Sequence, residues 1–427
     1  MAGRSDRREM GMNGCGEAAV ALQDSVRKAC GLWQVGLAPF LVLTLAFSTA
    51  EAIAPTKVFN VKHFGAIAGG STDCSKAFLN AWKEACAWEG AGAARVLVPA
   101  GTFLVGPAIF KGPCKSSIAF QVTGVVKAPG LDKFPSDGWI EFQYIDSLMV
   151  TGGGTFDGQG AAAWPLNQCP KMQKCKHLPT SLRFAFVNDA TIRKITSLNS
   201  KQFHMNLFAC KNVKLQALTI SAPGDSPNTD GIHMGDVSGI KISRSVIGTG
   251  DDCISIGPGS SNISISNVVC GPGHGISIGS LGKYATDKDV VDVKVRNCTI
   301  KDTTNGLRIK TWQDSAVMSA SNFTFEDIVM NNAYNPIIID QEYCPSASCT
   351  AKSPSRVKIS DVSFKNIRGS SASPVAVHLL CSKGVPCQNV RLENIDLEYK
   401  GVGGPAKASC SSVKGISSGP QNPPSCL

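Results

Sequence analysis

Three aspartates and one histidine in the middle of the chain have residue types and spacing that could support proton transfer. Asp251 and Asp252 are adjacent, Asp230 lies one short segment before them, and His274 lies one short segment after them, between two glycines. Carboxylates that lie close together disfavour each other's charge, so the pKa of at least one of them rises. Glycoside hydrolysis uses such a set, in which one protonated carboxyl is the acid and an ionised one is the base or nucleophile.

The spacing of three of these residues indicates a repeating fold. Asp230, Asp252 and His274 are separated by equal intervals of 22 residues, and each lies two residues before the first isoleucine of a short alternating segment. A period of about 20 to 30 residues built from short strands is typical of a solenoid, whose repeats bury their apolar sides against one another. If the repeats stack as a parallel sheet, equivalent residues lie about 4.8 Å apart. We therefore expect these three side chains to form one column on the surface.

Two cations extend the same pattern. The apolar residues of the alternating segments should point inward, so that the alternate residues point outward and form two further columns. One column contains His233, Ser255, Ser277, Arg308 and Ile338, and the other contains Gly235, Gly257, Gly279, Lys310 and Asp340. The small residues leave room for a groove, and Arg308 and Lys310 on its floor suit a carboxylate ligand. The pattern predicts an acidic ligand.

Strand-like segments of a second kind recur from about residue 148 onward. Each alternates apolar and polar residues and is bounded by Gly, Asn, Asp or Ser, as turns require. Their first apolar residues, at intervals of 21 to 34 residues, are Ile192, Val213, Ile240, Ile263, Val293, Phe323, Val357 and Val390. Helical periodicity is absent after residue 90, which excludes solenoids with a helix in each repeat, and the shared register of the polar column disfavours a propeller. These observations predict an all-β fold, a single-stranded right-handed parallel β-helix.

The two ends of the predicted solenoid differ in composition. Residues 57–99 have the pattern of a strand, a helix and a strand, with helical spacing from Ala77 to Trp88. This helix is expected to cap the N-terminal end, whose strand edges would otherwise stay unpaired. The segment after Tyr399 is rich in Gly, Ser, Lys and Pro and lacks a strand pattern. We expect it to wrap or close the C-terminal end.

Residues 1–54 are expected to form an N-terminal extension and a secretory signal peptide, followed by one β-helix domain over residues 55–427. Residues 36–52 contain an apolar run of secretory length, preceded by basic residues and followed by small residues that suit cleavage near Ala50, Ala52 or Ala54. A single N-terminal membrane anchor is the alternative, but the run is short for a span. The rest of the chain offers no other candidate span, so no membrane contact is expected after cleavage.

The cysteines agree with secretion, because 15 of the 17 follow Ala54 and so many suggest an oxidising compartment. Pairs close in sequence are the expected bridges, and the odd number leaves at least one thiol free or bonded to another chain. The predicted pairs are Cys253 with Cys270, Cys169 with Cys175, Cys344 with Cys349, Cys381 with Cys387, and Cys410 with Cys426. The spacing of His and Cys matches no zinc-ligand pattern, so no metal is predicted. Three glycosylation sequons begin at Asn262, Asn297 and Asn322.

The formal net charge of +10 lies wholly beyond residue 54, because residues 1–54 carry five basic and five acidic residues. A basic surface favours a polyanionic partner. Nucleic acid is disfavoured, since the chain is expected to be secreted and lacks a module of basic and aromatic residues that binds nucleic acid. A polyanion of the cell wall is the better candidate.

Four motifs in the central region resemble the signatures of the polygalacturonases, glycoside hydrolase family 28. They are Asn228-Thr229-Asp230, Gly250-Asp251-Asp252, Gly273-His274-Gly275 and Arg308-Ile309-Lys310, all intact and in order. The resemblance covers residues 57–427 and is strongest to plant exopolygalacturonases of the pollen type. It implies a pectin-lyase-like β-helix and a monomeric enzyme, secreted to the cell wall or apoplast and without metal or other cofactor. The implied reaction is inverting hydrolysis of α-1,4-galacturonosyl linkages in pectic polygalacturonate, with release of galacturonate from the non-reducing end.

The same resemblance implies a role for each residue of the predicted site. Asp251 is the proton donor, Asp230 and Asp252 hold the attacking water, and His274 assists the acid. Asn228, Arg308, Lys310 and Tyr343 are implied as substrate ligands. The acid and base of an inverting enzyme are expected to stand about 6.5 to 9.5 Å apart, leaving room for the water.

Other functions remain possible on the same fold. An endopolygalacturonase would use the same site, because exo action depends on turn insertions that close one end of the groove. A pectate lyase would need calcium and a basic proton abstractor, and the Gly-His-Gly and Arg-Ile-Lys motifs argue against it. A non-catalytic pectin-binding wall protein should have lost catalytic acids, and none is missing here. Action on branched pectin such as rhamnogalacturonan is disfavoured by the two cations, which suit plain galacturonate.

Overall fold

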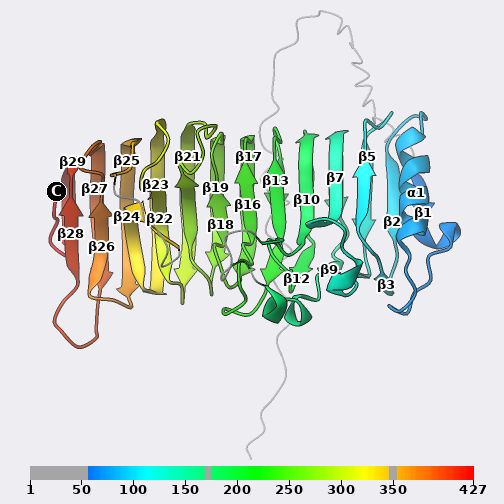
Figure 1. The fold of residues 1–427 in the computed structure, drawn as a ribbon, viewed down its shortest axis with the longest axis horizontal. Helices are drawn as coiled ribbons and strands as arrows, with labels where there is room; N and C mark the ends of the chain where they lie inside the picture. The colour runs from blue at the N-terminus through cyan, green and yellow to red at the C-terminus, as the bar shows by residue number, and fades with distance from the viewer. Residues whose placement is uncertain (1–55, 168, 170–174, 346–352) are drawn as a thin grey trace, which may run out of the picture. The chain divides into compact units, whose positions relative to one another are not determined.

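The computed structural model describes residues 56–167, 169, 175–345 and 353–427, and their strands wind into a right-handed parallel β-helix, as predicted. Successive turns lie side by side along the long axis, with α1 (Ser75–Ala87) at one end and the last strands at the other (Figure 1). The 3-10 helices are η1 (Val61–Phe64), η2 (Leu131–Lys133), η3 (Gly160–Ala162) and η4 (Trp164–Leu166). No helix in the described ranges is long and apolar enough to span a membrane.

One face of the β-helix is an 11-stranded parallel sheet. Its strands in order are β4 (Ala108–Lys111), β7 (Gly138–Asp146), β10 (Thr180–Asn188), β13 (Met205–Phe208), β16 (Ile232–Gly235), β18 (Ile254–Ile256), β20 (Ile276–Leu281), β22 (Asn305–Trp312), β24 (Asn335–Tyr343), β26 (Val375–Leu380) and β28 (Lys407–Ser411). This face consists of the alternating segments that follow Asp230, Asp252 and His274 in the sequence, and the predicted site residues lie on it or just before it.

The remaining strands form an 18-stranded parallel sheet that covers the other faces. Its strands are β1 (Lys57–Asn60), β2 (Ala94–Val98), β3 (Thr102–Leu104), β5 (Ile118–Val122), β6 (Val125–Lys127), β8 (Leu148–Thr151), β9 (Thr155–Asp157), β11 (Thr191–Arg193), β12 (Thr196–Leu198), β14 (Lys214–Gln216), β15 (Thr219–Ser221), β17 (Ser238–Gly248), β19 (Ser261–Cys270), β21 (Val290–Lys301), β23 (Met318–Ala333), β25 (Val357–Ser371), β27 (Cys387–Glu398) and β29 (Val413–Asn422). From β17 onward each turn uses one long strand here, where earlier turns use two short ones.

Columns of identical or similar apolar residues fill the interior. One column on the 11-stranded sheet pairs residues of β16 to β26 in direct register, and every member is at most 1% exposed. Its members are Ile232, Ile254, Ile276, Leu307, Ile337 and Val377. Full burial of such a side chain contributes about 1.5–3 kcal/mol. The alternation of apolar and polar residues therefore fixes the register of each turn, because a slip by one residue would turn the column outward.

The long strands bend at Asn and Asp residues in the left-handed backbone region. In β19 and β21 the bends fall at Asn262, Asn267, Asp292 and Asn297, all with positive φ. Short polar side chains tolerate this conformation better than other residues that carry a Cβ atom. The same side chains also bond from turn to turn, since Asn297 Nδ2 donates to Asn267 Oδ1 at 2.6 Å. The Asn and Asp that precede or divide the strands in the sequence are thus corner residues.

The N-terminal end is capped by α1, as the sequence predicted. Its Phe78 and Trp82 are buried and contact the aromatic rings of the first turns, with Trp82 5.2 Å from Phe110 between ring centroids. The ring series continues inward, because Phe142 of β7 stacks on Phe184 of β10 at 5.4 Å. The helix therefore covers apolar surface that a further turn of sheet would otherwise cover.

The C-terminal segment differs from the prediction that it lacks strands. Its β28 and β29 continue both sheets by pairing with β26 and β27. Every residue of β29 is at least partly exposed. No further turn in the described part of the chain covers these strands, so their side chains need not alternate between apolar and polar, and the sequence pattern fails for this reason.

Four of the five predicted disulfides are confirmed. They are Cys169–Cys175, Cys253–Cys270, Cys381–Cys387 and Cys410–Cys426. The fifth predicted pair includes Cys349, which lies outside the described residues. A bridge that was not predicted, Cys86–Cys114, joins α1 to the segment after β4 across 28 residues; nearness in sequence could not reveal it. Among the described cysteines, the free thiols Cys74, Cys210 and Cys298 are all buried.

We expect Phe184→Ala to lower the free energy of unfolding by about 3–5 kcal/mol, because the side chain is 1% exposed and its removal leaves a cavity. Phe186→Ala, two residues along the same strand, is the matched control. Its side chain is 42% exposed and stacks on Tyr144, so its loss should cost only about 1 kcal/mol. Urea unfolding followed by circular dichroism measures both, and equal losses would contradict this account of the core.

Candidate active site

The predicted polar column is confirmed in its register but not in its exposure. Asp230, Asp252 and His274 immediately precede β16, β18 and β20, and backbone bonds join their turns: Gly231 N–H donates to the Asp252 carbonyl at 2.9 Å. Asp230 is only 6% exposed and Asp252 only 1%. The expectation of a surface column is therefore wrong for the two aspartates. Cations and hydroxyl groups of the following turns cover them.

The turns that hold the aspartates are tied together by side-chain bonds. Thr229 Oγ1 accepts from the Gly250 N–H at 2.9 Å and lies 2.6 Å from Ser226 Oγ. A Cβ atom at Gly250 would collide with the backbone of Ser226. The Thr in Asn-Thr-Asp and the Gly in Gly-Asp-Asp thus dock two successive turns, which fixes the carboxylates that follow them.

Asp252 is the most strongly paired carboxylate of the site. Its Oδ1 accepts from Arg308 Nη2 at 2.6 Å and Ser277 Oγ at 2.8 Å, and its Oδ2 accepts from Lys310 Nζ at 2.7 Å. Burial alone would raise the pKa of Asp252, but the charges of Lys310 and Arg308 outweigh it and lower the pKa to about 2. Asp252 is therefore ionised at neutral and mildly acidic pH.

Asp230 lies in the opposite electrostatic situation. Burial raises its pKa well above the usual value, and the negative charges of Asp251 and Asp252 raise it further. Ser255 Oγ donates to its Oδ2 at 2.7 Å, and His233 Nδ1 lies 2.7 Å from the same hydroxyl. The pKa of His233 is lowered to about 4 by burial and by Lys310. A neutral imidazole thus fixes the hydroxyl that faces Asp230.

Asp251 and His274 are the more accessible pair. Their side chains are 18% and 38% exposed, and His274 Nδ1 lies 3.0 Å from Asp251 Oδ1. The same oxygen accepts from the Asp252 N–H at 2.8 Å, while Asn228 Nδ2 donates to the other oxygen at 3.3 Å. The predicted contact between the histidine and this carboxylate is confirmed. Asp251 is the carboxyl of the site that a ligand can reach most easily.

Arg308, Lys310 and Tyr343 lie together, but the two cations point to Asp252. Lys310 is only 6% exposed. The Tyr343 ring covers both cations, with its centroid 5.2 Å from Lys310 Nζ and 6.0 Å from Arg308 Cζ. The sequence predicted these cations for a ligand carboxylate, and in the structure they also neutralise a carboxylate of the protein itself.

The site also includes residues to which the sequence analysis assigned no chemical role. Ser255, Ser277 and His233 were expected only as members of an outward column, and that register is confirmed. Their hydrogen bonds to the aspartates could not be read from spacing. The only signal was that small polar residues recur at the alternate positions of consecutive strands. Phe203, which stacks on His233 at 4.6 Å between ring centroids, carried no such signal.

Two groups of side chains in the described part of the chain have the spacing of metal ligands. One consists of Asp251, Asp252 and His274, whose nearest ligand atoms lie within 4.8 Å of one another. Both oxygens of Asp252 are already bonded to cations, so a metal ion would have to compete with them. The other group contains Cys169 and Cys175, whose sulfurs are joined in a disulfide. Neither set has the free thiolates or uncommitted carboxylates that a metal site needs.

Comparison with known proteins places this chain in a family. The model for glycosyl hydrolases family 28 matches residues 89–426. An exopolygalacturonase of Platanus acerifolia is 52% identical over 86% of this chain and 97% of its own length. An exopolygalacturonase of Zea mays is 48% identical over 87% of this chain and 90% of its own. The chain belongs to glycosyl hydrolase family 28 and is a glycoside hydrolase.

A solved structure supports the fold. The endo-xylogalacturonan hydrolase from Aspergillus tubingensis superposes with a TM-score of 0.72 at 23% identity, over 85% of this chain and 100% of that one. At this identity the likeness concerns the architecture and not the substrate.

Asp252→Asn is expected to lower the free energy of unfolding at neutral pH by about 3–5 kcal/mol, because Arg308 and Lys310 would stay buried without their anion. The folded-state pKa of Asp252, about 2, lies below the unfolded value of about 3.9. Its stabilisation is therefore present above pH about 4 and is lost as pH falls toward about 2. Urea unfolding between these pH values should show a smaller acid loss in the variant than in the parent protein.

Asp225→Asn provides the control, since Asp225 is exposed in the turn before β16 and loses the same charge. A variant of Asp252 that is as stable as this control at neutral pH would contradict the role given to the ion cluster.

Proposed function

We propose that the protein is an exopolygalacturonase, which releases galacturonate from the non-reducing end of pectic polygalacturonate. The observation that carries this proposal is one cluster of three carboxylates, one held ionised and one with a raised pKa, beside two cations and an accessible histidine. Relatives at 52% and 48% identity bear the name exopolygalacturonase and are matched over at least nine-tenths of their length.

Asp251 is the proposed proton donor to the leaving oxygen. It is the accessible carboxyl, and His274 and Asn228 fix both of its oxygens. Asp252, held ionised by two cations, and Asp230 hold the attacking water. Burial and like charge raise the pKa of Asp230, so the cluster retains a proton that the reaction can use. Close carboxylates that cannot all ionise are a recurrent source of an acid and a base in one site.

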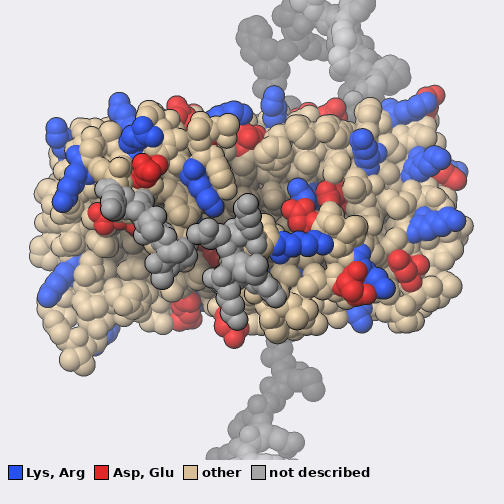
Figure 2. Space-filling model, in the orientation of Figure 1, with Lys and Arg blue, Asp and Glu red and all other residues tan. Residues whose placement is uncertain are grey.

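Arg308, Lys310 and Tyr343 are the proposed ligands of the substrate carboxylate, with Asn228 as a further contact. The cation pair carries two positive charges, while Asp252 supplies one negative charge. The excess of positive charge is available to an acidic sugar. Mixed charge is also a property of the surface, where Figure 2 shows acidic and basic side chains interspersed near the middle of the drawn face.

Exo action is supported by bulky side chains on the turns that precede the aspartates. Phe203 stacks on His233 there, and the segment with η3 and η4 lies against the same turn, because Trp164 Nε1 donates to the Ser200 carbonyl at 3.0 Å. An endo-acting enzyme on the same site is the alternative, and it would need that side to be open to the polymer.

Inversion is proposed from the family. The spacing of Asp251 and Asp252 does not itself support it. The nearest oxygens of Asp251 and Asp252 lie within 4.8 Å, which is shorter than the separation of about 6.5–9.5 Å expected for an inverting pair. The proposed water is held by both Asp252 and Asp230, so its position does not depend on the separation of Asp251 and Asp252 alone. The anomer of the product therefore tests this part of the proposal directly.

The proposed cellular setting follows from the sequence and the disulfides. The protein acts as a monomer in the cell wall or apoplast, through one catalytic β-helix of residues 55–427, after removal of the leader. Its substrate is a polyanion other than nucleic acid. A non-catalytic wall-binding protein is disfavoured, since no catalytic carboxylate has been lost.

The test is to follow the early products released from polygalacturonate by the purified protein and by Asp251→Asn. We expect galacturonate monomer alone, initially as the β anomer by proton NMR. Loss of the general acid should slow release by about 10²–10⁴-fold. Asp225→Asn, with the same loss of charge at an exposed site, should retain activity.

Other products would change the assignment. Mixed saturated oligomers would make the enzyme endo-acting, an initial α anomer would make it retaining, and unsaturated products would replace hydrolysis by elimination. A folded protein without products would favour the binding protein.

A further inference from the structure

A series of cations and aromatic rings leads away from the catalytic carboxylates toward the segment after β20. From Lys310, the Tyr343 ring is 5.2 Å away, and Trp312 of β22 lies 5.5 Å from Tyr343 between ring centroids. Lys283 Nζ follows, 5.0 Å from the Trp312 ring and 5.3 Å from the ring of Tyr284. The series thus ends in an ammonium group held between two rings, on the β20 and β22 turns that also carry His274 and Arg308.

Lys283 is a cation without an anionic partner in the described part of the chain, where no carboxylate lies within ion-pair distance of it. The other cations nearby differ in this respect. Arg308 and Lys310 bind Asp252, and Lys288 of the same segment binds Asp236 Oδ1 at 2.9 Å. Since the rings hold its ammonium by cation–π contacts, Lys283 has a defined place and a free charge.

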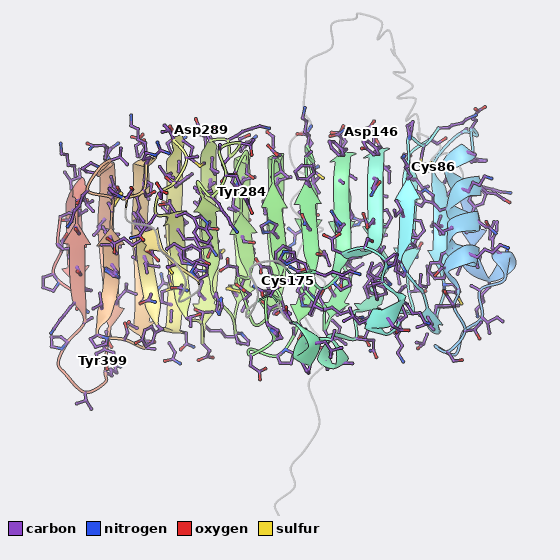
Figure 3. The ribbon with its side chains drawn as sticks, viewed as in Figure 1. Cys86, Asp146, Cys175, Tyr284, Asp289 and Tyr399 are labelled. Atoms are coloured by element: carbon purple, nitrogen blue, oxygen red, sulfur yellow. A yellow bond between two sulfur atoms is a disulfide. The ribbon has the colours of Figure 1, made fainter. Side chains whose placement is uncertain are left out.

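The backbone that carries Lys283 is fixed in place. The Gly282 carbonyl accepts from the Ala316 N–H at 2.9 Å, and a Cβ atom at Gly282 would lie 2.6 Å from Ser315 Cβ. The Asp287 N–H closes the next turn by donating to the Tyr284 carbonyl at 3.0 Å. Figure 3 shows Tyr284 near the middle of the length of the β-helix, well apart from the end loop that carries Tyr399.

We propose that Lys283, with Trp312 and Tyr284, binds the galacturonate unit next to the one held by Arg308, Lys310 and Tyr343. The ammonium group pairs with the carboxylate of that sugar, and the rings contact its apolar face. This inference rests on the proposed function. It also requires the polymer to leave the site over the ends of β20 and β22, where Lys283 and Trp312 lie. Phe203 and Trp164 lie on earlier turns and leave this side open.

Substrate length tests the proposal. A dimer of galacturonate spans only the cleaved bond, whereas a trimer places its third unit at Lys283. Lys283→Ala should therefore raise KM for trigalacturonate about tenfold, the usual effect of losing one hydrogen bond to a charged group. It should leave KM for digalacturonate and kcat for both substrates unchanged. Lys283→Arg, which keeps the charge, should restore most of the loss.

Lys294→Ala removes the same charge from an exposed position of β21 on the other sheet and should leave both KM values unchanged. The inference is overturned if Lys283→Ala affects dimer and trimer equally, changes neither, or changes the trimer no more than Lys294→Ala does. Circular dichroism checks that each variant folds. If Lys283→Ala misfolds, the same comparison of KM for trimer and dimer is made with Lys283→Gln. A parent protein that releases galacturonate from neither substrate would instead contradict the proposed function.

Discussion

The parallel register between neighbouring turns is the constraint on which the rest of the structure depends. Strand pairing sets an offset of 22 residues from β16 to β18 and from β18 to β20, and of 31 residues from β20 to β22, so residues far apart in sequence become spatial neighbours. The apolar columns make this register costly to change, and the corner asparagines and aspartates fix where each turn bends. Three separate sequence motifs thereby become one site within a single β-helix.

The neighbours of the two buried carboxylates also determine which of them carries a charge. Asp230 and Asp252 are nearly inaccessible, and buried carboxylates are costly unless they are paired. Asp252 is paired with two cations and keeps its charge, whereas Asp230 receives only hydroxyl bonding and tends to keep its proton. Two residues of the same type thus acquire opposite protonation preferences from their neighbours. These cations are also the proposed ligands of an acidic sugar, so in that proposal charge compensation and ligand recognition involve the same residues.

Much of the fold and the site could be predicted from the sequence, for reasons that particular residues show. Equal spacing of Asp230, Asp252 and His274 predicted their register because a solenoid converts sequence intervals into stacking. The same spacing could not predict burial, which depends on how far Arg308 and Lys310 reach over Asp252. Cys86–Cys114 was missed because the bridge follows from the docking of α1, a tertiary contact. The strands of the last turn were missed because an uncovered turn has no apolar pattern to detect.

The two ends of the β-helix have different consequences for association. At the N-terminal end, α1 lies across the first turns and covers their apolar surface. At the C-terminal end, β29 leaves one edge without a following strand, and such an edge is a template for another chain. Its side chains are mostly exposed, it contains Pro420, and Cys410–Cys426 ties the last residues back to β28. Proline cannot donate to a ladder. These features of β29, and α1 at the other end, therefore oppose end-to-end pairing of one β-helix with the next.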